Sequence, residues 1–267
     1  MFTSFWFEFT ILLFAAILGS VAIIPYSLRL LKESKKSKRL TLPRWMLVLL
    51  SVIQNGVLFA IAIGIGLVLS HQIGHGAPFI EAINTGRGFN QTLTANLIIA
   101  LGLGIIGGSF LLLVDLLFLP YFPKKLLDTA LKTTYWENIS ASFYGGINEE
   151  LFMRLCGLSV IVWLFSKILP TTAEISSVSI FWIANVIMAV IFALGHLPTL
   201  KSTLGEISRV MLFRTILLNT PIGLICGWIF WHSGIEAAIV THFMADIVYH
   251  VGGTRVLRSK FKQASKR

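Results

Sequence analysis

Seven long apolar runs constrain the fold of this chain more than any other feature of its sequence. An apolar helix needs roughly 20 residues to cross the hydrocarbon core of a bilayer, at a rise of about 1.5 Å per residue. Each run is therefore predicted to be a transmembrane helix. The short link between the last two runs leaves the count open by one, and eight spans is the alternative. The runs cover about residues 5–31, 45–70, 93–119, 138–169, 178–197, 210–231 and 234–251.

The composition agrees with a membrane location. Of the 267 residues, 55% are hydrophobic and 13% are charged, whereas a typical soluble domain has about 25% charged residues. The predicted fold class is all-α: a polytopic transmembrane helical bundle that forms a single integral membrane domain over residues 1–267. The net charge of +10 could suggest nucleic acid. No soluble segment combines basic with interleaved aromatic residues, so the expected partner is the lipid bilayer and not nucleic acid.

The placement of Lys and Arg predicts the orientation of the bundle. Nineteen of the 22 basic residues lie in one alternating set of loops, within 29–44, 121–137, 201–214 and the tail 255–267. Cytoplasmic loops carry such an excess, so the N-terminus is expected outside and the C-terminus in the cytoplasm. The N-terminal stretch has no basic residue and carries Glu8, which indicates a retained span and not a cleaved signal peptide. A multi-pass protein of a plasma membrane, bacterial in origin, is expected.

Three further segments have readable patterns. Residues 71–92 contain several Gly and Asn residues and are expected to form a loop. Within 121–137, apolar residues recur at helical spacing, which predicts a short helix lying on the membrane surface. The third span is expected to pack closely against its neighbours through small residues. These residues are Gly102, Gly104, Gly107 and Gly108.

The fourth apolar run contains three ionisable residues in close succession. Glu149 and Glu150 are adjacent, and Arg154 follows Glu150 by four positions. A charged side chain at the centre of a bilayer costs about 2.5–3.5 kcal/mol on insertion scales, so such groups usually mark functional sites. Acid before base at i and i+4 favours an ion pair along one helix. Glu149 points about 100° away from Glu150 and need not share its role.

Three other runs carry polar groups that can face this stretch: the fifth, the seventh and the third, which holds Asp115 near its cytoplasmic end. His196 lies near the end of the fifth run, while His242 and Asp246 share one face of the seventh. In the predicted topology all of them lie between the bilayer centre and the cytoplasmic side. We therefore expect one cluster of two carboxylates, two imidazoles and a further carboxylate, in a cavity that cytoplasmic water can enter.

This set of groups suits hydrolysis. A carboxylate kept from bulk water can act as a general base toward a bound water molecule. Imidazoles can share that water or donate to the oxyanion that forms when it attacks an amide carbonyl. The simplest assignment gives the chemistry to Glu149 and the support of the site to the Glu150–Arg154 pair.

Three motifs on separate spans resemble those of the CPBP family, the CAAX-protease and bacteriocin-processing intramembrane proteases, also grouped as the Abi family. The resemblance covers about residues 140–251, and the first three spans carry none of it. It implies that the first three spans are a variable part (1–137), followed by catalytic core helices (138–252) and a basic tail (253–267). The motifs are Glu149-Glu150-x-x-x-Arg154, Phe192-x-x-x-His196 and His242-x-x-x-Asp246.

The resemblance implies an endopeptidase that cleaves near the cytoplasmic face, in CAAX-type processing or in maturation of a bacteriocin or signal-peptide precursor. The substrate would be a peptide or membrane-protein segment, with or without a lipid anchor. By analogy, Glu149 and His196 would activate water, and His242 with Asp246 would stabilise the oxyanion. Many relatives carry Asn at the last position, where an ionised Asp can only accept hydrogen bonds. Asp246 is therefore expected to be replaceable by Asn.

A metal ion is the open question about cofactors. The family is often labelled metalloprotease, and Glu149, His196 and His242 could hold zinc with water as the fourth ligand. The sequence has no His-Glu-x-x-His motif, and a glutamate–histidine pair can activate water without a metal. We therefore expect that no cofactor is required, with a divalent metal as the alternative.

Two other classes of function are compatible with the spans. One is a non-catalytic bacteriocin-immunity or membrane scaffold protein on the same fold, which would have no need for costly buried charges. The other is a transporter or channel in which the same residues relay protons, although no internal repeat is visible.

The remaining polar residues receive structural interpretations. Asp115 is expected to pair with Lys124 or to be solvated at the interface, and Arg214 is expected to extend to the cytoplasmic interface. The remaining histidines are interpreted as hydrogen-bonded packing residues, and both cysteines as small apolar residues that fill helix–helix contacts. These are His71, His75, His232, His250, Cys156 and Cys226.

Overall fold

The computed structural model describes residues 2–33, 42–169, 177–253, 256–257 and 260. All regular structure in these ranges is helical, which confirms the predicted all-α class. In chain order the elements are α1 (Phe2–Ala22), α2 (Ile24–Glu33), α3 (Arg44–Gln72), α4 (Pro78–Asn84), α5 (Gln91–Phe118), η2 (Leu119–Tyr121), α6 (Lys124–Lys132), α7 (Tyr135–Tyr144), η3 (Gly145–Glu149), η4 (Leu151–Leu158), α8 (Ser159–Ile168), α9 (Ser177–Gly195), α10 (Leu197–Leu204), α11 (Arg209–Ser233), α12 (Ile235–Asp246) and η5 (Ile247–Gly252).

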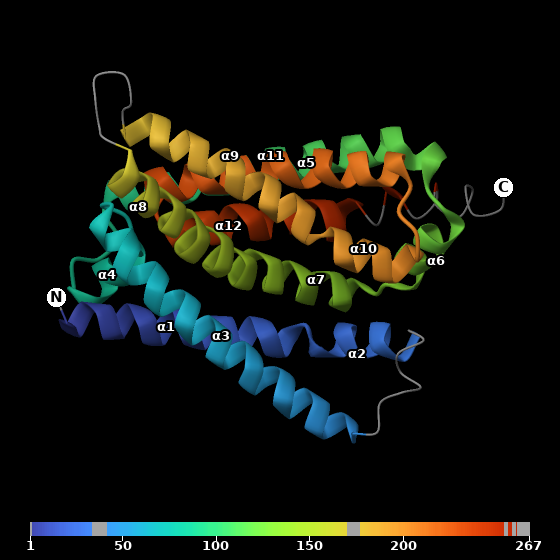
Figure 1. Cartoon of the computed structure of the whole chain (residues 1–267), viewed down its shortest axis with the longest axis horizontal. Helices are drawn as coiled ribbons and strands as arrows, with labels where there is room; N and C mark the ends of the chain where they lie inside the picture. The colour runs from blue at the N-terminus through green and yellow to red at the C-terminus, as the bar shows by residue number, and fades with distance from the viewer. Residues whose placement is uncertain (1, 34–41, 170–176, 254–255, 258–259, 261–267) are drawn as a thin grey trace.

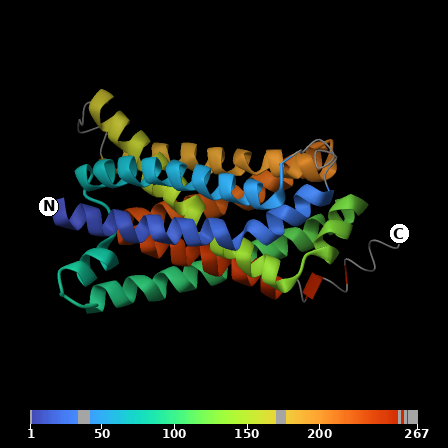
Figure 2. The same cartoon turned by 90° about the horizontal axis from the view of Figure 1, so that it is seen from below.

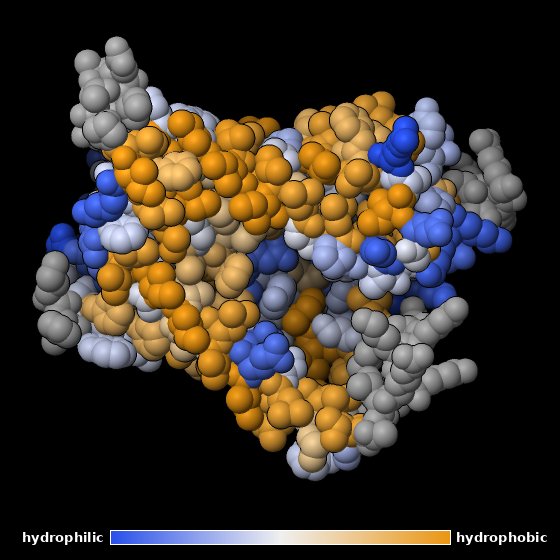
Figure 3. All heavy atoms as spheres, in the orientation of Figure 1, coloured by the Kyte–Doolittle hydropathy of each residue, from blue (hydrophilic) through white to orange (hydrophobic). Residues whose placement is uncertain are grey.

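Six of the described helices are long and apolar enough to cross a membrane. They coincide with the first six predicted runs. The seventh predicted run corresponds to α12 and η5, which follow one another directly. Figure 3 shows apolar residues over the middle of the visible face and hydrophilic residues toward its two ends, as expected for a bundle that spans a bilayer.

The long helices run along one common axis, and α12 lies among them (Figures 1 and 2). It packs most extensively on α5, and also on α11 and η3. The largest hydrophobic core joins α1 and α3 to η4, α9 and the first half of α12, with fully buried side chains that include Ile63, Leu151 and Phe181. This core holds the fourth span between the N-terminal helices on one side and α9, α11 and α12 on the other.

The first predicted span consists of two helices. α1 ends at Ala22 and α2 begins at Ile24, with Pro25 in the first turn of α2. Proline is tolerated in a first helical turn but cannot continue the hydrogen-bond ladder of the preceding helix, so it accounts for the break. Figure 1 shows the N-terminal part of α3 diverging from α2 beyond this break.

The prediction of a loop over residues 71–92 was wrong in part, because the segment contains helix α4. Pro78 stands in its first turn, where a missing N–H costs nothing. Oε1 of Glu236 accepts hydrogen bonds from the backbone N–H groups of Phe79 (3.0 Å) and Ile80 (2.9 Å). A carboxylate from the start of α12 therefore satisfies the free N–H groups of α4.

Glycines of α5 allow it to approach α12 closely. A Cβ atom on Gly104 would lie 2.6 Å from the carbonyl oxygen of Thr241, and one on Gly108 would lie 2.4 Å from that of Ala245. The predicted close packing is thus confirmed for these two positions. It was wrong for Gly102, where a Cβ would meet nothing within 4 Å.

The helix predicted within 121–137 is present as α6, which begins at Lys124 and ends at Lys132. Its position on a membrane surface stays a prediction, as does the orientation of the termini. The basic segment 32–44 and the basic tail 253–267 fall largely outside the described residues.

Candidate active site

The segment that carries the two glutamates is π-helical. η3 and η4 interrupt the long helix between α7 and α8, where the sequence predicted a regular α-helix. Such turns, with hydrogen bonds from i to i+5, occur frequently at functional sites. Gly146 lets η3 reach α12, because a Cβ on it would lie 2.7 Å from Cβ of Phe243. The two elements that carry Glu149 and His242 are thereby in direct contact.

Glu150 is the centre of a buried network. Its Oε1 atom lies 2.8 Å from Nη1 of Arg154 and 2.7 Å from Nδ1 of His242. Nη2 of Arg154 also donates to the carbonyl oxygen of Gly223 at 3.2 Å. All three side chains are at least 95% buried. A buried carboxylate needs such partners, since an isolated charge away from water is very costly.

Phe192 connects this network with the second histidine. Its ring meets the rings of His196 and His242 edge to face, with centroids 4.7 Å and 5.6 Å apart. The Arg154 guanidinium lies over the same ring, 4.7 Å from its centroid. One buried aromatic side chain of α9 therefore contacts three of the six predicted site residues, and it was not among them.

The hydrogen bonds of the two histidines fix their tautomers when they are neutral. Nδ1 of His196 lies 2.8 Å from the carbonyl oxygen of Phe192, which can only accept, so Nδ1 carries the proton. Nδ1 of His242 donates to the carboxylate of Glu150 in the same way. In both rings Nε2 is left as the nitrogen that can accept a proton or bind water.

Asp246 lies beside Nε2 of His242, with Oδ1 at 3.9 Å, and at the same distance from Nε2 of His250. Gly145 borders this space, because a Cβ on it would lie 2.9 Å from Oδ2 of Asp246 and 3.6 Å from Nε2 of His242. The side of His242 that faces away from Glu150 is therefore kept clear by a glycine.

Glu149 differs from its neighbour. Its side chain is partly exposed, and it is close enough to Tyr144, His242 and Asp246 to interact with them electrostatically. A cavity of about 340 Å³ adjoins Tyr144, between α1, α2 and the first half of α3, with Ser20, Ser51 and Asn55 in its wall. Figure 3 shows a hollow with hydrophilic residues inside it on the visible face.

The donor set for a metal differs from the predicted one. In the part of the chain that the structure describes, one group of three His, Cys, Asp or Glu side chains brings its potential metal-ligand atoms within 4.8 Å of one another: Glu150, Cys226 and His242, all buried. This set does not fit a catalytic metal, because Arg154 already pairs with Glu150 and a catalytic ion needs an open position for water. Glu149 and His196 are not part of it.

Comparison with known families gives a match for the segment that contains the six predicted site residues. Residues 131–248 match the model of the type II CAAX prenyl endopeptidases described as Rce1-like. This segment is similar to the Rce1-like family. The family supports an intramembrane endopeptidase that acts on a peptide or protein in the membrane, and it agrees with the resemblance to CPBP proteases. The chain matched neither a curated protein nor a solved structure.

All six predicted site residues lie inside the Rce1-like segment, on three of the predicted spans. Glu150, Arg154, His242 and Asp246 form the connected network described above. His196 joins it through Phe192, and Glu149 lies beside it. Gly145 and Cys226 belong to the same neighbourhood and were not predicted. Gly145 lies four residues before the quoted motif, but only the fold reveals that it faces Asp246.

The interpretations of Asp115 and Arg214 were wrong. The side chain of Arg214 is only 12% exposed. Its Nε and Nη2 atoms donate to the two carboxylate oxygens of Asp115 at 2.7 Å and 2.8 Å. Tyr249, on η5 next to the site, donates to the same carboxylate. A bidentate ion pair of this kind compensates both buried charges. Asp115 therefore needs neither Lys124 nor water as a partner.

His71 is hydrogen-bonded, as expected from the sequence. Its Nε2 lies 3.0 Å from Oε2 of Glu8, which is 2% exposed and also accepts from Ser4 Oγ. The carboxylate in the first span is thus paired with the end of α3. This pair lies outside the Rce1-like segment.

Proposed function

We propose that this chain hydrolyses a peptide bond within the membrane, with a water molecule activated by Glu149 and His196. The observation that carries the proposal is the contrast between the two glutamates. Glu150 is buried, with one carboxylate oxygen held by both Arg154 and His242, whereas Glu149 is partly exposed at the edge of the same network. A supporting carboxylate and a reactive one require these two environments.

In this mechanism the Glu149 carboxylate takes a proton from water, and the resulting hydroxide attacks the carbonyl carbon of the substrate. Nε2 of His196 is available as an acceptor for the same water, since Nδ1 is bound to the Phe192 carbonyl. The proton then passes to the leaving amine when the tetrahedral intermediate collapses.

The oxyanion of that intermediate requires a donor. His242 supplies one from Nε2 when its ring carries both protons, a state that Glu150 favours by accepting from Nδ1. Asp246, 3.9 Å from Nε2, orients the ring. Glu150, Arg154 and Phe192 are assigned to holding His242 in place, and none of these steps is routed through a metal.

We propose a membrane-anchored peptide as the substrate: a prenylated C-terminus, as the family description suggests, or a bacteriocin or signal-peptide precursor. The polar wall of the cavity beside Tyr144 supports a peptide, because backbone N–H and C=O groups need partners inside a membrane. The basic loops support a cytoplasmic site in a plasma membrane, which we propose to be bacterial.

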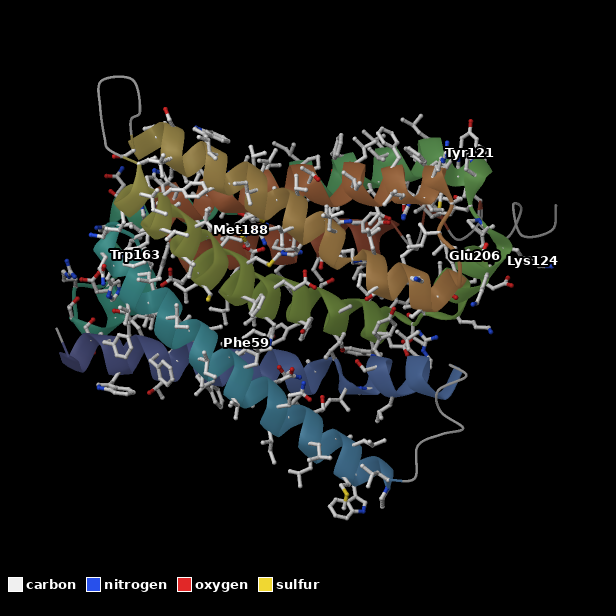
Figure 4. All side chains as sticks on the ribbon, viewed as in Figure 1. Phe59, Tyr121, Lys124, Trp163, Met188 and Glu206 are labelled. Atoms are coloured by element: carbon white, nitrogen blue, oxygen red, sulfur yellow. The ribbon has the colours of Figure 1, made fainter. Side chains whose placement is uncertain are left out.

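The test compares wild type with Glu149→Gln on a peptide ending in a prenylated CAAX sequence and on the same peptide without the prenyl group. Loss of the base is expected to reduce kcat/KM by about 10²–10⁴-fold. Glu206→Gln is the control, because Glu206 is exposed in the loop before α11, beside Lys124 in Figure 4. Equal cleavage by Glu149→Gln and wild type would contradict the mechanism and leave the non-catalytic scaffold as the better account.

Metal dependence is tested separately, by elemental analysis of the purified protein and by activity after chelation. Unchanged activity is expected. Loss of activity on chelation that is restored by zinc would require a metal-based mechanism.

A further inference from the structure

Asn148 connects η3, the element that carries Glu149, to α1, the first helix of the chain. It lies in η3, directly before Glu149, and its side chain is fully buried. Its Nδ2 atom donates to the carbonyl oxygen of Ala16 at 2.8 Å and to Oγ of Ser20 at 3.0 Å. Both acceptors belong to α1, which lies outside the Rce1-like segment.

The surface of α1 is shaped to receive this amide. A Cβ atom on Gly19 would lie 1.9 Å from Oδ1 of Asn148, so a side chain there would displace the asparagine. Ala16 is also fully buried, and it belongs to the same hydrophobic core as Ile147. A small residue and a glycine therefore form a notch on α1 in which the Asn148 side chain sits.

Glu149 depends on this contact for its position. In the part of the chain that the structure describes, the Glu149 carboxylate makes no hydrogen bond and no ion pair, unlike that of Glu150. Its location therefore follows from the backbone of η3. That backbone is π-helical and is fixed one residue earlier by the hydrogen bonds of Asn148.

We propose that Asn148 is a positioning residue for Glu149, and that α1 is part of the catalytic apparatus through Ala16, Gly19 and Ser20. The proposal rests on the proposed function, in which Glu149 is the base. It assigns a role to an N-terminal span that the family match does not include. A general base must lie within hydrogen-bond reach of the water it activates, so a shift of about 1 Å can cost about 10²-fold in rate.

Asn185 provides a matched control. It is 1% exposed, its Nδ2 donates to the carbonyl oxygen of Leu224 at 3.1 Å, and a Cβ on Gly227 would lie 1.9 Å from its Oδ1. Asn185 is thus a buried amide that, like Asn148, links two helices by a hydrogen bond to a backbone carbonyl and lies against a glycine. The helices it links are α9 and α11. It has no link to η3.

The experiment measures kcat, KM and thermal unfolding for Asn148→Ala and Asn185→Ala. Both variants are expected to lose similar stability. Asn148→Ala is expected to lower kcat at least 10-fold with KM within about 3-fold of wild type, whereas Asn185→Ala keeps kcat within about 3-fold. Equal kcat values in the two variants would overturn the proposal.

Two changes on α1 keep the test decisive if Asn148→Ala fails to fold. Ser20→Ala removes one acceptor and Gly19→Ala displaces the amide, so both are expected to lower kcat while Asn148 is retained. Ser20 also borders the cavity, so kcat and not KM is the readout. Unchanged kcat in both would overturn the proposal. If Glu149→Gln remains active as well, the proposed function fails; if it is inactive, only the role of Asn148 fails.

Discussion

Nδ1 of His242 lies 2.7 Å from Oε1 of Glu150, and the same oxygen lies 2.8 Å from Nη1 of Arg154. One carboxylate oxygen therefore orients a histidine on α12 and compensates a guanidinium on its own helix. This relationship makes Glu150 a structural requirement of the site. It also leaves the Nε2 side of His242, next to Gly145 and Asp246, for the substrate.

Glu150→Gln is expected to destabilise the protein by about 3–5 kcal/mol, because it leaves the buried Arg154 charge without a counterion. Thermal or denaturant unfolding in detergent measures the loss. Activity is expected to fall with it, since the amide no longer favours the protonated ring of His242.

The matched control for that change is Glu81→Gln. Glu81 pairs with Arg87 at 2.7 Å, but both side chains are at least half exposed. Exposed ion pairs contribute about 0–1 kcal/mol. A loss in Glu81→Gln as large as that in Glu150→Gln would show that burial is not what makes the Glu150 pair important.

Asp246→Asn is expected to keep activity within about 10-fold of wild type. An Asn amide can orient His242 and can also donate a hydrogen bond to the oxyanion. Asp246→Ala removes the group that orients His242, so the oxyanion loses its correctly placed donor, and kcat is expected to fall by about 10²–10³-fold, the usual cost of losing one oxyanion contact. An inactive Asp246→Asn variant with a normal unfolding temperature would mean that the negative charge itself is required.

Gly145→Ala tests whether the space beside His242 is used. The added methyl group would lie 2.9 Å from Oδ2 of Asp246 and 3.6 Å from Nε2 of His242. We expect kcat/KM to fall at least 10-fold, with a small change in unfolding temperature. Gly102→Ala is the control, because a Cβ there meets nothing within 4 Å. Full activity of Gly145→Ala would place the substrate elsewhere.

His75 predicts a pH dependence of stability. Burial lowers its pKa to about 4, with a smaller lowering from the nearby His232, and the centroid of its ring lies 4.0 Å from that of Trp231. The unfolded chain, with a pKa of about 6.5 at this residue, binds more protons between these two values. The contribution of neutral His75 is therefore complete above pH 6.5 and is lost as the pH falls toward 4.

The measurement compares the unfolding temperatures of wild type and His75→Gln at pH 7.5 and pH 5. The unfolding temperature of wild type is expected to fall more between the two pH values than that of the variant, because the other titrating groups are common to both proteins. Equal losses would show that His75 does not contribute to the acid sensitivity.

The parts of the site that sequence predicted best are those that depend on local spacing. Glu150 and Arg154 pair because four residues on a helix bring side chains onto one face. The grouping of three spans followed from the cost of buried charge, which requires partners. The roles assigned to Glu149 and His196 rest on that reasoning and stay predictions.

The contacts that sequence did not predict are long-range. Glu8 and His71 are 63 positions apart, and Asp115 and Arg214 are 99 positions apart. Which helices become neighbours decides such pairs, and hydropathy carries no information on it. The π-helical turns were missed for another reason: a shift from i+4 to i+5 hydrogen bonds leaves the apolar pattern almost unchanged.

The π-helical geometry of η3 and η4 also sets how this segment tolerates changes in length. A π-helical turn contains more residues than an α-helical one. Deleting one residue between Gly145 and Leu158 would let the segment relax toward a regular α-helix. Residues beyond the deletion would then rotate by about 100° relative to those before it. Glu150 and Arg154 would no longer face their present partners, so insertions and deletions here should be far more harmful than most substitutions.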